Sequence, residues 1–567
     1  MSPYCVAFAV LVVTHLYLKR KNSTRQRKAT SGEMERLPDA TDAVDLFEQE
    51  PRTAYLKLVQ KHGPTFLMHV SPYIASMYGV PRVVATCDPA MVKELLRGRK
   101  HVDKRPDRYK AGMFLPGLAG VLWMEGEAWT ERRRALNPVF RHDTFEHYAT
   151  WMHDMTTELI GGPEWKWNND SKKRSTSAAK QPEEEKTESA EVDMVKELRK
   201  LATSFVIGFG CDCDPSSLEG KQLHSALSDY DEKKRLSGAI GWFAIPRFIY
   251  GLGMLFGDAQ RIRKAVAGVQ VAKAKREQDS EAEQAAASDS DGSAAAPSSN
   301  QADVDADVGF RPGGGSGLPS WLSGMVEANY EEKAIFNEVN HLHGAHKAAA
   351  IMWAFTLYEL CKKPQWQTRL RDEMAAVIAT HSGGHGDGGK QGVLGREDLG
   401  ELKQTMMVWK EVLRMHPIAL GVLRQTGEDL TLPQTATAAG VPAVTIPAGT
   451  PVVLLLQALH YHPSFWSDPT DFKPDRWDKD TSALHTASDP GTDMETASAF
   501  VPFLDGKRQC AGRFLAELEF VSVLHVLLRT FDFELSDPDY DPKLKPDVYP
   551  ILERPMMMTV TRRGEAK

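Results

Sequence analysis

The sequence predicts a mainly helical protein with a small β-sheet region near the N-terminus. Helical periodicity dominates, and the run from Ser320 to Lys363 is unusually long for one without proline. Strand-like pieces are short and lie far apart, namely "TFLMHV", "RVVAT", "PVVLLL" and "MMMTVT". A chain of 567 residues with 42% hydrophobic residues has ample apolar material for a large core.

Charge and cysteine content exclude several classes of protein. The formal net charge of −7 shows no basic excess, so we expect no nucleic-acid partner. The cysteines are too sparse and too irregularly spaced for a disulfide framework or a paired CxxC zinc site. This sparse use of cysteine predicts that the folded part lies in a reducing compartment. The cysteines are Cys5, Cys87, Cys211, Cys213, Cys361 and Cys510.

The first thirty residues differ from the rest of the chain. Residues 3–18, "PYCVAFAVLVVTHLYL", carry no formal charge and are followed by the basic stretch "KRKNSTRQRK". This layout predicts an N-terminal membrane anchor with a cytoplasmic stop signal over 1–30. At about 1.5 Å per residue the apolar run is short for a bilayer core of about 30 Å, so the flanking residues would have to snorkel. A cleaved signal peptide and an organelle transit peptide remain the alternatives.

Polar, Ala/Ser/Gly-rich inserts interrupt the remaining sequence. They are nearly free of aromatic residues, so we expect solvated loops that mark edges rather than domains. A single folded domain over 34–567 is therefore predicted, with inserts near 164–193, 277–317, 381–395 and 479–498.

Cys510 precedes an apolar helix. The following segment "AGRFLAELEFVSVLHVLLRTF" is apolar almost all round, which predicts a buried helix. A thiol at the N-terminal end of such a helix is favoured as a thiolate, the form that binds metals. Gly506 and Gly512 would let the backbone approach a flat group, and Arg508 could meet an acid on it. An inert core cysteine is the alternative interpretation.

The pattern around this cysteine resembles the haem-binding loop of the cytochrome P450 family at all five places, Phe503-x-x-Gly506-x-Arg508-x-Cys510-x-Gly512. Three further segments, in family order, strengthen the resemblance. "KEVLRMHP" supplies Glu411 and Arg414, "FKPDRW" supplies Arg476, and "EAWTERRRALNPVF" supplies Trp129 and Arg133. The resemblance implies the cytochrome P450 fold from about Leu37 to the C-terminus, apart from the inserts.

The resemblance also implies roles for these residues. Cys510 would be the proximal axial ligand of haem b, iron protoporphyrin IX, with Phe503 shielding the sulfur. Glu411, Arg414 and Arg476 would form a buried structural network whose loss should cost haem incorporation. The positions that usually hold the haem propionates are Trp129, Arg133, Arg424 and Arg508, although each arginine taken alone would more often be a solvated surface charge.

The long helix departs from the family. "GAHKAA" falls over the distal motif, and it puts Lys347 at the acid position and Ala348 at the threonine position. The pair that relays protons to dioxygen is therefore missing. Gly344 keeps the small residue of the motif and shares one helix stripe with His341, Ala348 and Met352.

Four interpretations of this departure stay open. Protons could arrive through water, a substrate hydroxyl, His341 or His346. Lys347 could hold an anionic substrate, because a cation in an apolar pocket needs a partner. The protein could rearrange a peroxide instead of reducing dioxygen. Finally, Lys347 could point into solvent.

The resemblance implies a membrane-anchored monooxygenase that inserts one oxygen atom from dioxygen into a lipophilic substrate. The apolar, glycine-rich region 108–126 is suited to an access lid. No flavin or iron–sulfur domain is appended, so electrons would come from a separate NADPH-dependent reductase. A docking face for it could comprise Arg132, Arg133, Arg134, Arg141, Lys507 and Arg513.

Two alternative functions and a cellular location are also predicted. A peroxide isomerase or dehydratase of the same fold is the second enzyme interpretation, and a non-catalytic haem-binding sensor is the third. The anchor predicts the endoplasmic reticulum membrane, with the catalytic domain in the cytoplasm, or an organelle if the N-terminus is a transit peptide.

Overall fold

The structure is a computed structural model of the chain. Two compact units divide it: the first comprises 1–112, 156–199 and 348–567, and the second comprises 113–155 and 200–347. The residues that the structure describes are 34–40, 51–69, 82–97, 120–122, 124–140, 142–161, 189–211, 213–239, 260–271, 321–381, 392–432, 444–478, 499–545 and 551–564.

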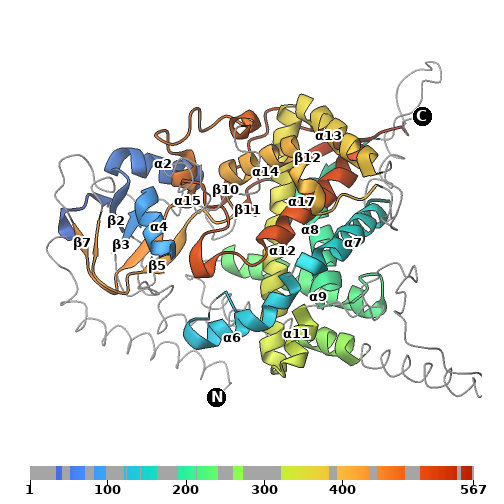
Figure 1. Ribbon diagram of the computed structural model, residues 1–567, viewed down its shortest axis with the longest axis horizontal. Coiled ribbons are helices and arrows are strands. Elements are labelled where there is room, and N and C mark those ends of the chain that lie inside the picture. Colours follow the sequence, from blue (N-terminus) through green and yellow to red (C-terminus); the bar gives the residue numbers. More distant parts are fainter. Residues whose placement is uncertain are drawn as a thin grey trace, which may run out of the picture. The chain divides into compact units, whose positions relative to one another are not determined.

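A mixed five-stranded sheet in the first unit has the order β1-β2-β3-β8-β5. β2 runs antiparallel to β3, and β8 runs parallel to β3 and antiparallel to β5. Helices α2 and α15 pack together, and α2 lies against β1 and β2 (Figure 1). The bounds are β1 Asp39–Ala40, β2 Thr65–His69, β3 Arg82–Thr86, β5 Val422–Gln425, β8 Pro451–Leu454, α2 Pro51–His62 and α15 Leu456–Tyr461.

A three-stranded antiparallel sheet has the order β4-β12-β9. β4 corrects one predicted boundary, because Ser189–Asp193 pairs with β12 along its whole length and is not solvated loop. The strand-like segments read from the sequence are confirmed as β2, β3, β8 and β12. The remaining bounds are β9 Phe531–Leu535, β12 Met557–Arg562, β10 Leu544–Lys545, β11 Ile551–Leu552, β6 Leu430–Thr431 and β7 Thr445–Ile446.

Helices dominate both units, so the mainly helical prediction is confirmed. The α-helices are α4 Pro89–Arg97, α6 Gly126–Leu136, α7 His142–Gly161, α8 Met194–Phe205, α9 Leu218–Ala239, α11 Trp321–Glu327, α12 Glu332–Lys362, α13 Gln365–His381, α14 Lys403–Met415 and α17 Arg513–Thr530. The short turns are η2 Met34–Arg36, η4 Asn137–Phe140, η6 Val206–Gly210, η7 Glu397–Gly400, η9 Pro474–Trp477 and η10 Gly506–Arg508.

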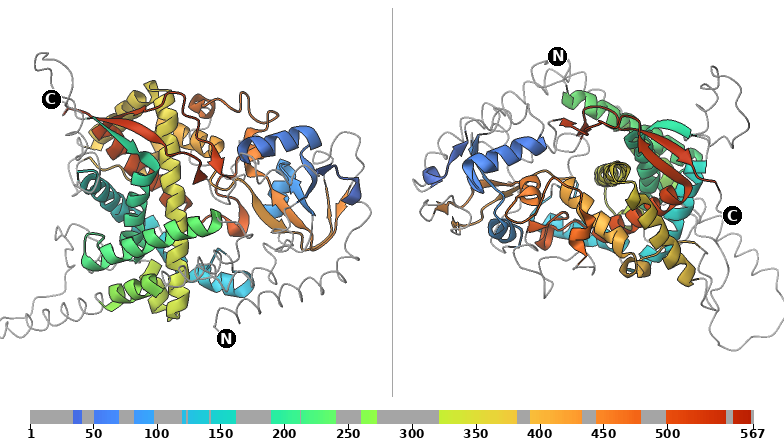
Figure 2. Two further views of the ribbon diagram at one scale, coloured as in Figure 1. Left: turned by 180° about the vertical axis from the view of Figure 1, so that it is seen from behind. Right: turned by 90° about the horizontal axis from the view of Figure 1, so that it is seen from above.

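The long proline-free run is two helices rather than one. α11 ends at Glu327, Asn329 takes a left-handed φ of 55°, and α12 begins at Glu332. From there α12 continues without a break to Lys362, which Figure 2 shows as one straight rod. The predicted distal segment therefore lies within a single continuous helix.

The predicted anchor and most of the insert residues lie outside the described residues. Within the described part of the chain, no helix is long and apolar enough to cross a membrane. α17 is apolar and buried over most of its length, as the sequence predicted.

Candidate functional site

The loop before α17 is a tight, hydrogen-bonded turn. The backbone N–H of Cys510 donates to the carbonyl of Phe503 at 3.0 Å, which closes the loop. Leu504 and Gly506 both have left-handed φ values, 61° and 68°. Gly512 is the N-cap of α17, so Cys510 stands outside the helix rather than in its first turn. Cys510 is exposed, which contradicts the alternative interpretation of an inert core cysteine.

Gly506 is required by a neighbouring helix. A Cβ atom at this position would stand 2.3 Å from the carbonyl oxygen of Leu96, in the last turn of α4. Asp505 forms a short ion pair with Arg97 from the same turn. Gly506 therefore lets the loop approach α4, and this contact fixes one side of the turn that carries Cys510.

Exposure separates Cys510 from the other described cysteines. Burial raises the pKa of the Cys87 and Cys361 thiols to about 12, so both stay protonated near neutral pH. Cys211 and Cys213 are also buried. Cys510 is the exposed thiol among them, and a thiolate ligand has to be reachable by its metal.

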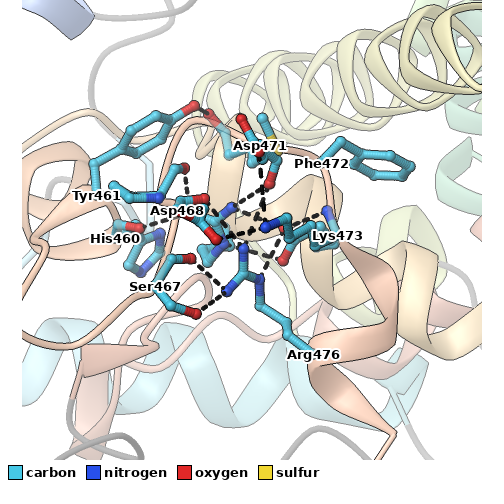
Figure 3. Close-up of polar contacts among 12 residues, drawn as sticks. His460, Tyr461, Ser467, Asp468, Asp471, Phe472, Lys473 and Arg476 are labelled. Atoms are coloured by element: carbon cyan, nitrogen blue, oxygen red, sulfur yellow. Dashed lines mark hydrogen bonds and ion pairs between the residues drawn. The ribbon is translucent and has the colours of Figure 1, made fainter.

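A buried ion-pair network supports the same region (Figure 3). The Glu411 carboxylate accepts from Arg414 Nε at 3.0 Å and Nη2 at 2.8 Å, and from Arg476 Nε at 3.0 Å. Arg414 Nη1 also donates to the carbonyls of His460 at 3.0 Å and Pro469 at 2.8 Å. The guanidinium of Arg476 points at the Ser467 carbonyl, 2.9 Å away. The three residues come together as the sequence predicted, and both members of the Glu411–Arg414 pair are fully buried.

Two members of this region were not predicted from the sequence. Trp477 Nε1 donates to Glu411 Oε2 at 2.9 Å, so a third side chain donates to this carboxylate besides those of Arg414 and Arg476. His460 Nε2 accepts from the Val501 N–H at 3.2 Å, and burial lowers the pKa of His460 to about 3, so the ring stays neutral and able to accept. The motif "FKPDRW" contains Trp477, so the sequence offered a signal for that residue. His460 is a lone histidine, for which the sequence offers no signal.

The predicted propionate-binding residues fall in both units. Arg424, on β5, is buried and donates from Nη1 to the Leu423 carbonyl at 2.9 Å. Arg508 lies in the cysteine loop and is half-buried. Trp129 and Arg133 lie on α6 at a spacing of four residues, and both are half-buried. Within the first unit, one loop therefore brings together Phe503, Gly506, Arg508, Cys510 and Gly512.

The distal segment of α12 presents two different faces. Lys347 and Ala348 are half-buried, whereas His343 and His346 are buried. The Nδ1 atom of His346 lies 3.1 Å from the Leu342 carbonyl, and its ring packs 6.2 Å from that of Phe209. The described residues contain no group of three or more His, Cys, Asp or Glu side chains able to hold a metal ion.

The predicted docking face is wrong in two of its members. Arg132 is buried and pairs with Glu338 at 3.0 Å. Arg513 is also buried, and its Nε lies 3.9 Å from Glu517 Oε1. Arg134 and Lys507 are exposed, Arg133 is half-buried, and Arg141 lies outside the described residues. Consecutive arginines on a helix cannot all face solvent, because successive positions are about 100° apart.

The sequence model of the family described as Cytochrome P450 matches residues 327–559. Over this part of its length the chain is similar to members of the cytochrome P450 family. It is 31% identical over 218 residues to Cytochrome P450 4X1 of Mus musculus, covering 37% of this chain and 38% of that one. It is 32% identical over 219 residues to Cytochrome P450 monooxygenase sphH of Aspergillus fumigatus, covering 38% and 36%.

A longer alignment covers most of the chain. Over 503 residues the chain is 25% identical to Cytochrome P450 CYP72A616 of Paris polyphylla, covering 86% of this chain and 79% of that one. In the matches to the two relatives above, by contrast, the aligned part spans little more than a third of each relative's length.

Proposed function

We propose that the protein is a haem-thiolate monooxygenase that inserts one oxygen atom from dioxygen into a lipophilic substrate. The observation that carries this proposal is the Cys510 turn, in which the backbone N–H of Cys510 donates to the Phe503 carbonyl and the thiol is exposed. An exposed thiol on a hydrogen-bonded loop, with Arg424 and Arg508 in the same unit, fits a haem that needs one thiolate and partners for its carboxylates.

In this proposal each residue of the chain has a definite task. Cys510 would supply the thiolate to iron, and Phe503 would cover the sulfur. Arg424 and Arg508 would bind the haem carboxylates through charge-assisted hydrogen bonds, and the resemblance adds Trp129 and Arg133 to this set. When bound, the haem supplies the chemistry of oxygen activation. Electrons come from a separate NADPH-dependent reductase.

The experiment uses the purified holoprotein, a microsomal reductase, NADPH and a lipid extract under heavy-isotope dioxygen. Mass spectrometry then looks for labelled products, and a parallel sample receives lipid hydroperoxide without reductant. A monooxygenase incorporates label only in the presence of the reductase. Hydroperoxide consumption without reductant and without label would contradict the proposal.

Lys347 and Ala348 favour a second candidate. With neither acid nor alcohol at the two relay positions, a peroxide isomerase or dehydratase, which needs no proton delivery to dioxygen, is the alternative. The hydroperoxide arm of the same experiment would identify it. A third candidate, a haem-binding sensor without turnover, would show neither activity while keeping the thiolate spectrum.

We also propose that residues 1–30 anchor the protein in the endoplasmic reticulum membrane with the catalytic domain in the cytoplasm. The uncharged stretch 3–18 and the basic residues after it support this arrangement. The apolar composition of region 108–126 supports a lid over the lipophilic substrate.

A further inference from the structure

A buried ion pair lies near the start of α12, in the second unit. The side chain of Glu338 is fully buried, and its Oε1 atom lies 3.0 Å from Arg132 Nη1 on α6. The same oxygen accepts from the backbone N–H of Val121 at 2.8 Å. Arg132 in turn stacks on Tyr330, with 4.0 Å between the guanidinium carbon and the ring centroid. These contacts satisfy one oxygen of Glu338 and fix the carboxylate in place.

The second oxygen faces an imidazole. Glu338 Oε2 lies 3.8 Å from His341 Nδ1, and only 11% of the His341 side chain is exposed. Within the described structure, neither Glu338 Oε2 nor either ring nitrogen of His341 has a hydrogen-bond partner. Buried polar atoms in proteins are nearly always bonded to protein or to ordered water. Ordered water is the partner that we expect for these atoms.

His341 is held in this position by its surroundings. A Cβ atom at Gly120 would stand 1.9 Å from His341 Nδ1, so the imidazole packs directly against a glycine. Glu338 on α12 and Arg132 on α6 are the charged groups that the described structure places at the pair. Arg132 engages the other oxygen of this carboxylate and balances its negative charge.

The position of His341 along α12 links it to the altered motif. His341 precedes Ala348 by seven residues, which is about two turns, so the two positions point within about 20° of each other. Gly344 lies between them, and a Cβ atom there would meet no atom within 4 Å. On this helix face, open space therefore lies beside Gly344, about halfway between His341 and Ala348.

The other two histidines of the segment do not share this face. His343 follows His341 by two residues and points about 160° away from it. His346 is buried against Phe209, with its Nδ1 at the Leu342 carbonyl. Of the three histidines, His341 is the one on the face of Ala348.

We propose that His341, supported by Glu338, positions the water that carries protons along α12 to the face of Ala348. His341 gives the proton on its ring nitrogen to that water, which passes one of its own protons onward. As the ring releases this proton it takes another at its second nitrogen from ordered water connected to solvent, so its charge does not change beside the fixed carboxylate of Glu338. This relay takes the place of the missing acid and alcohol, and it rests on the proposed monooxygenase function.

The test compares His341→Gln with His343→Gln, the same substitution on the opposite face of the same helix. Each holoprotein receives the microsomal reductase, NADPH and a lipid extract, and product and hydrogen peroxide are counted per NADPH. His341→Gln should lower product per NADPH by at least about tenfold, with a matching rise in peroxide and an unchanged thiolate spectrum. His343→Gln should leave this ratio within about twofold of the wild type.

Two further readouts separate a proton role from a structural one. Ala348→Thr added to His341→Gln should recover coupling. A high-resolution crystal structure of the wild type should show ordered water at His341 on the Ala348 side, and the variant should lack it.

Each outcome has one meaning. Labelled product from the wild type together with unchanged coupling in His341→Gln would overturn the role of His341 and leave the monooxygenase proposal standing. No labelled product from the wild type would overturn both proposals. An absence of ordered water at His341 in the wild-type crystal would overturn the relay whatever the activity.

Discussion

Individual side chains set the chemistry of the site. Cys510 is distinguished from its described counterparts by exposure, since burial raises the pKa of Cys87 and Cys361 to about 12. Glu411, in contrast to the exposed Cys510, is a buried carboxylate. Its two oxygens accept hydrogen bonds from Arg414, Arg476 and Trp477. Removing one partner of such a group leaves an uncompensated buried charge, which is more costly than never having had the pair.

Cys510→Ser should abolish the thiolate signature of the reduced carbon monoxide complex, because a hydroxyl does not replace a thiolate as an iron ligand. Absorption spectroscopy of the purified protein measures this. Cys361→Ser is the matched control, since that thiol is held protonated by burial, and it should leave the spectrum unchanged. An unaltered spectrum in Cys510→Ser would mean that another residue is the ligand.

Glu517 should make the stability depend on pH. Burial raises the pKa of Glu517 to about 7, against the attraction of Arg513, Arg396 and Lys410. The folded state therefore holds a proton that the unfolded state releases above its ordinary pKa of 4.5, so this contribution to stability is full below that value and is lost as pH rises through about 7.

Glu517→Gln removes this titration. Between pH 5 and 8, the wild type should lose about 2 to 3 kcal/mol of unfolding free energy relative to the variant. Denaturant unfolding of both holoproteins at the two pH values measures the difference, in which the titration of all other groups cancels. Parallel pH dependence in the two proteins would contradict the raised pKa.

At the scale of elements, backbone conformation decides how the cysteine loop is seated. The loop turns through two left-handed residues and meets the last turn of α4 at Gly506. On α12, a left-handed residue at Asn329 ends the preceding helix, so that the helix carrying the distal motif starts only at Glu332. In both places a few residues with uncommon φ values determine where a functional side chain stands.

Gly506→Ala should destabilise the holoprotein by about 2 to 5 kcal/mol, from left-handed strain and from the collision with the Leu96 carbonyl. Haem retention should fall in parallel. Gly400→Ala is the control, because a Cβ atom there meets nothing within 4 Å, and it should cost little. Unfolding midpoints and haem content measure both variants, and equal stabilities would show that the α4 contact is unimportant.

At the scale of the whole molecule, the chain combines a folded part with a distinctive N-terminal segment. Deleting residues 1–30 should shift the protein from the membrane fraction to the soluble fraction while leaving the thiolate spectrum intact, because the core elements start later in the chain. Fractionation of cells that express both forms measures this. Equal membrane association of both forms would mean that another surface binds the membrane.

The sequence by itself determined the helical class, the short strands, the cysteine loop and the Glu411, Arg414 and Arg476 set. These features depend on local spacing and on side chains with one dominant chemical use. Tertiary structure alone decided that Cys510 is exposed, that Gly506 meets α4, and that Arg132 pairs with Glu338 beside His341. Those outcomes depend on which distant segments pack together, and a buried charge finds its partner across the fold rather than along the chain.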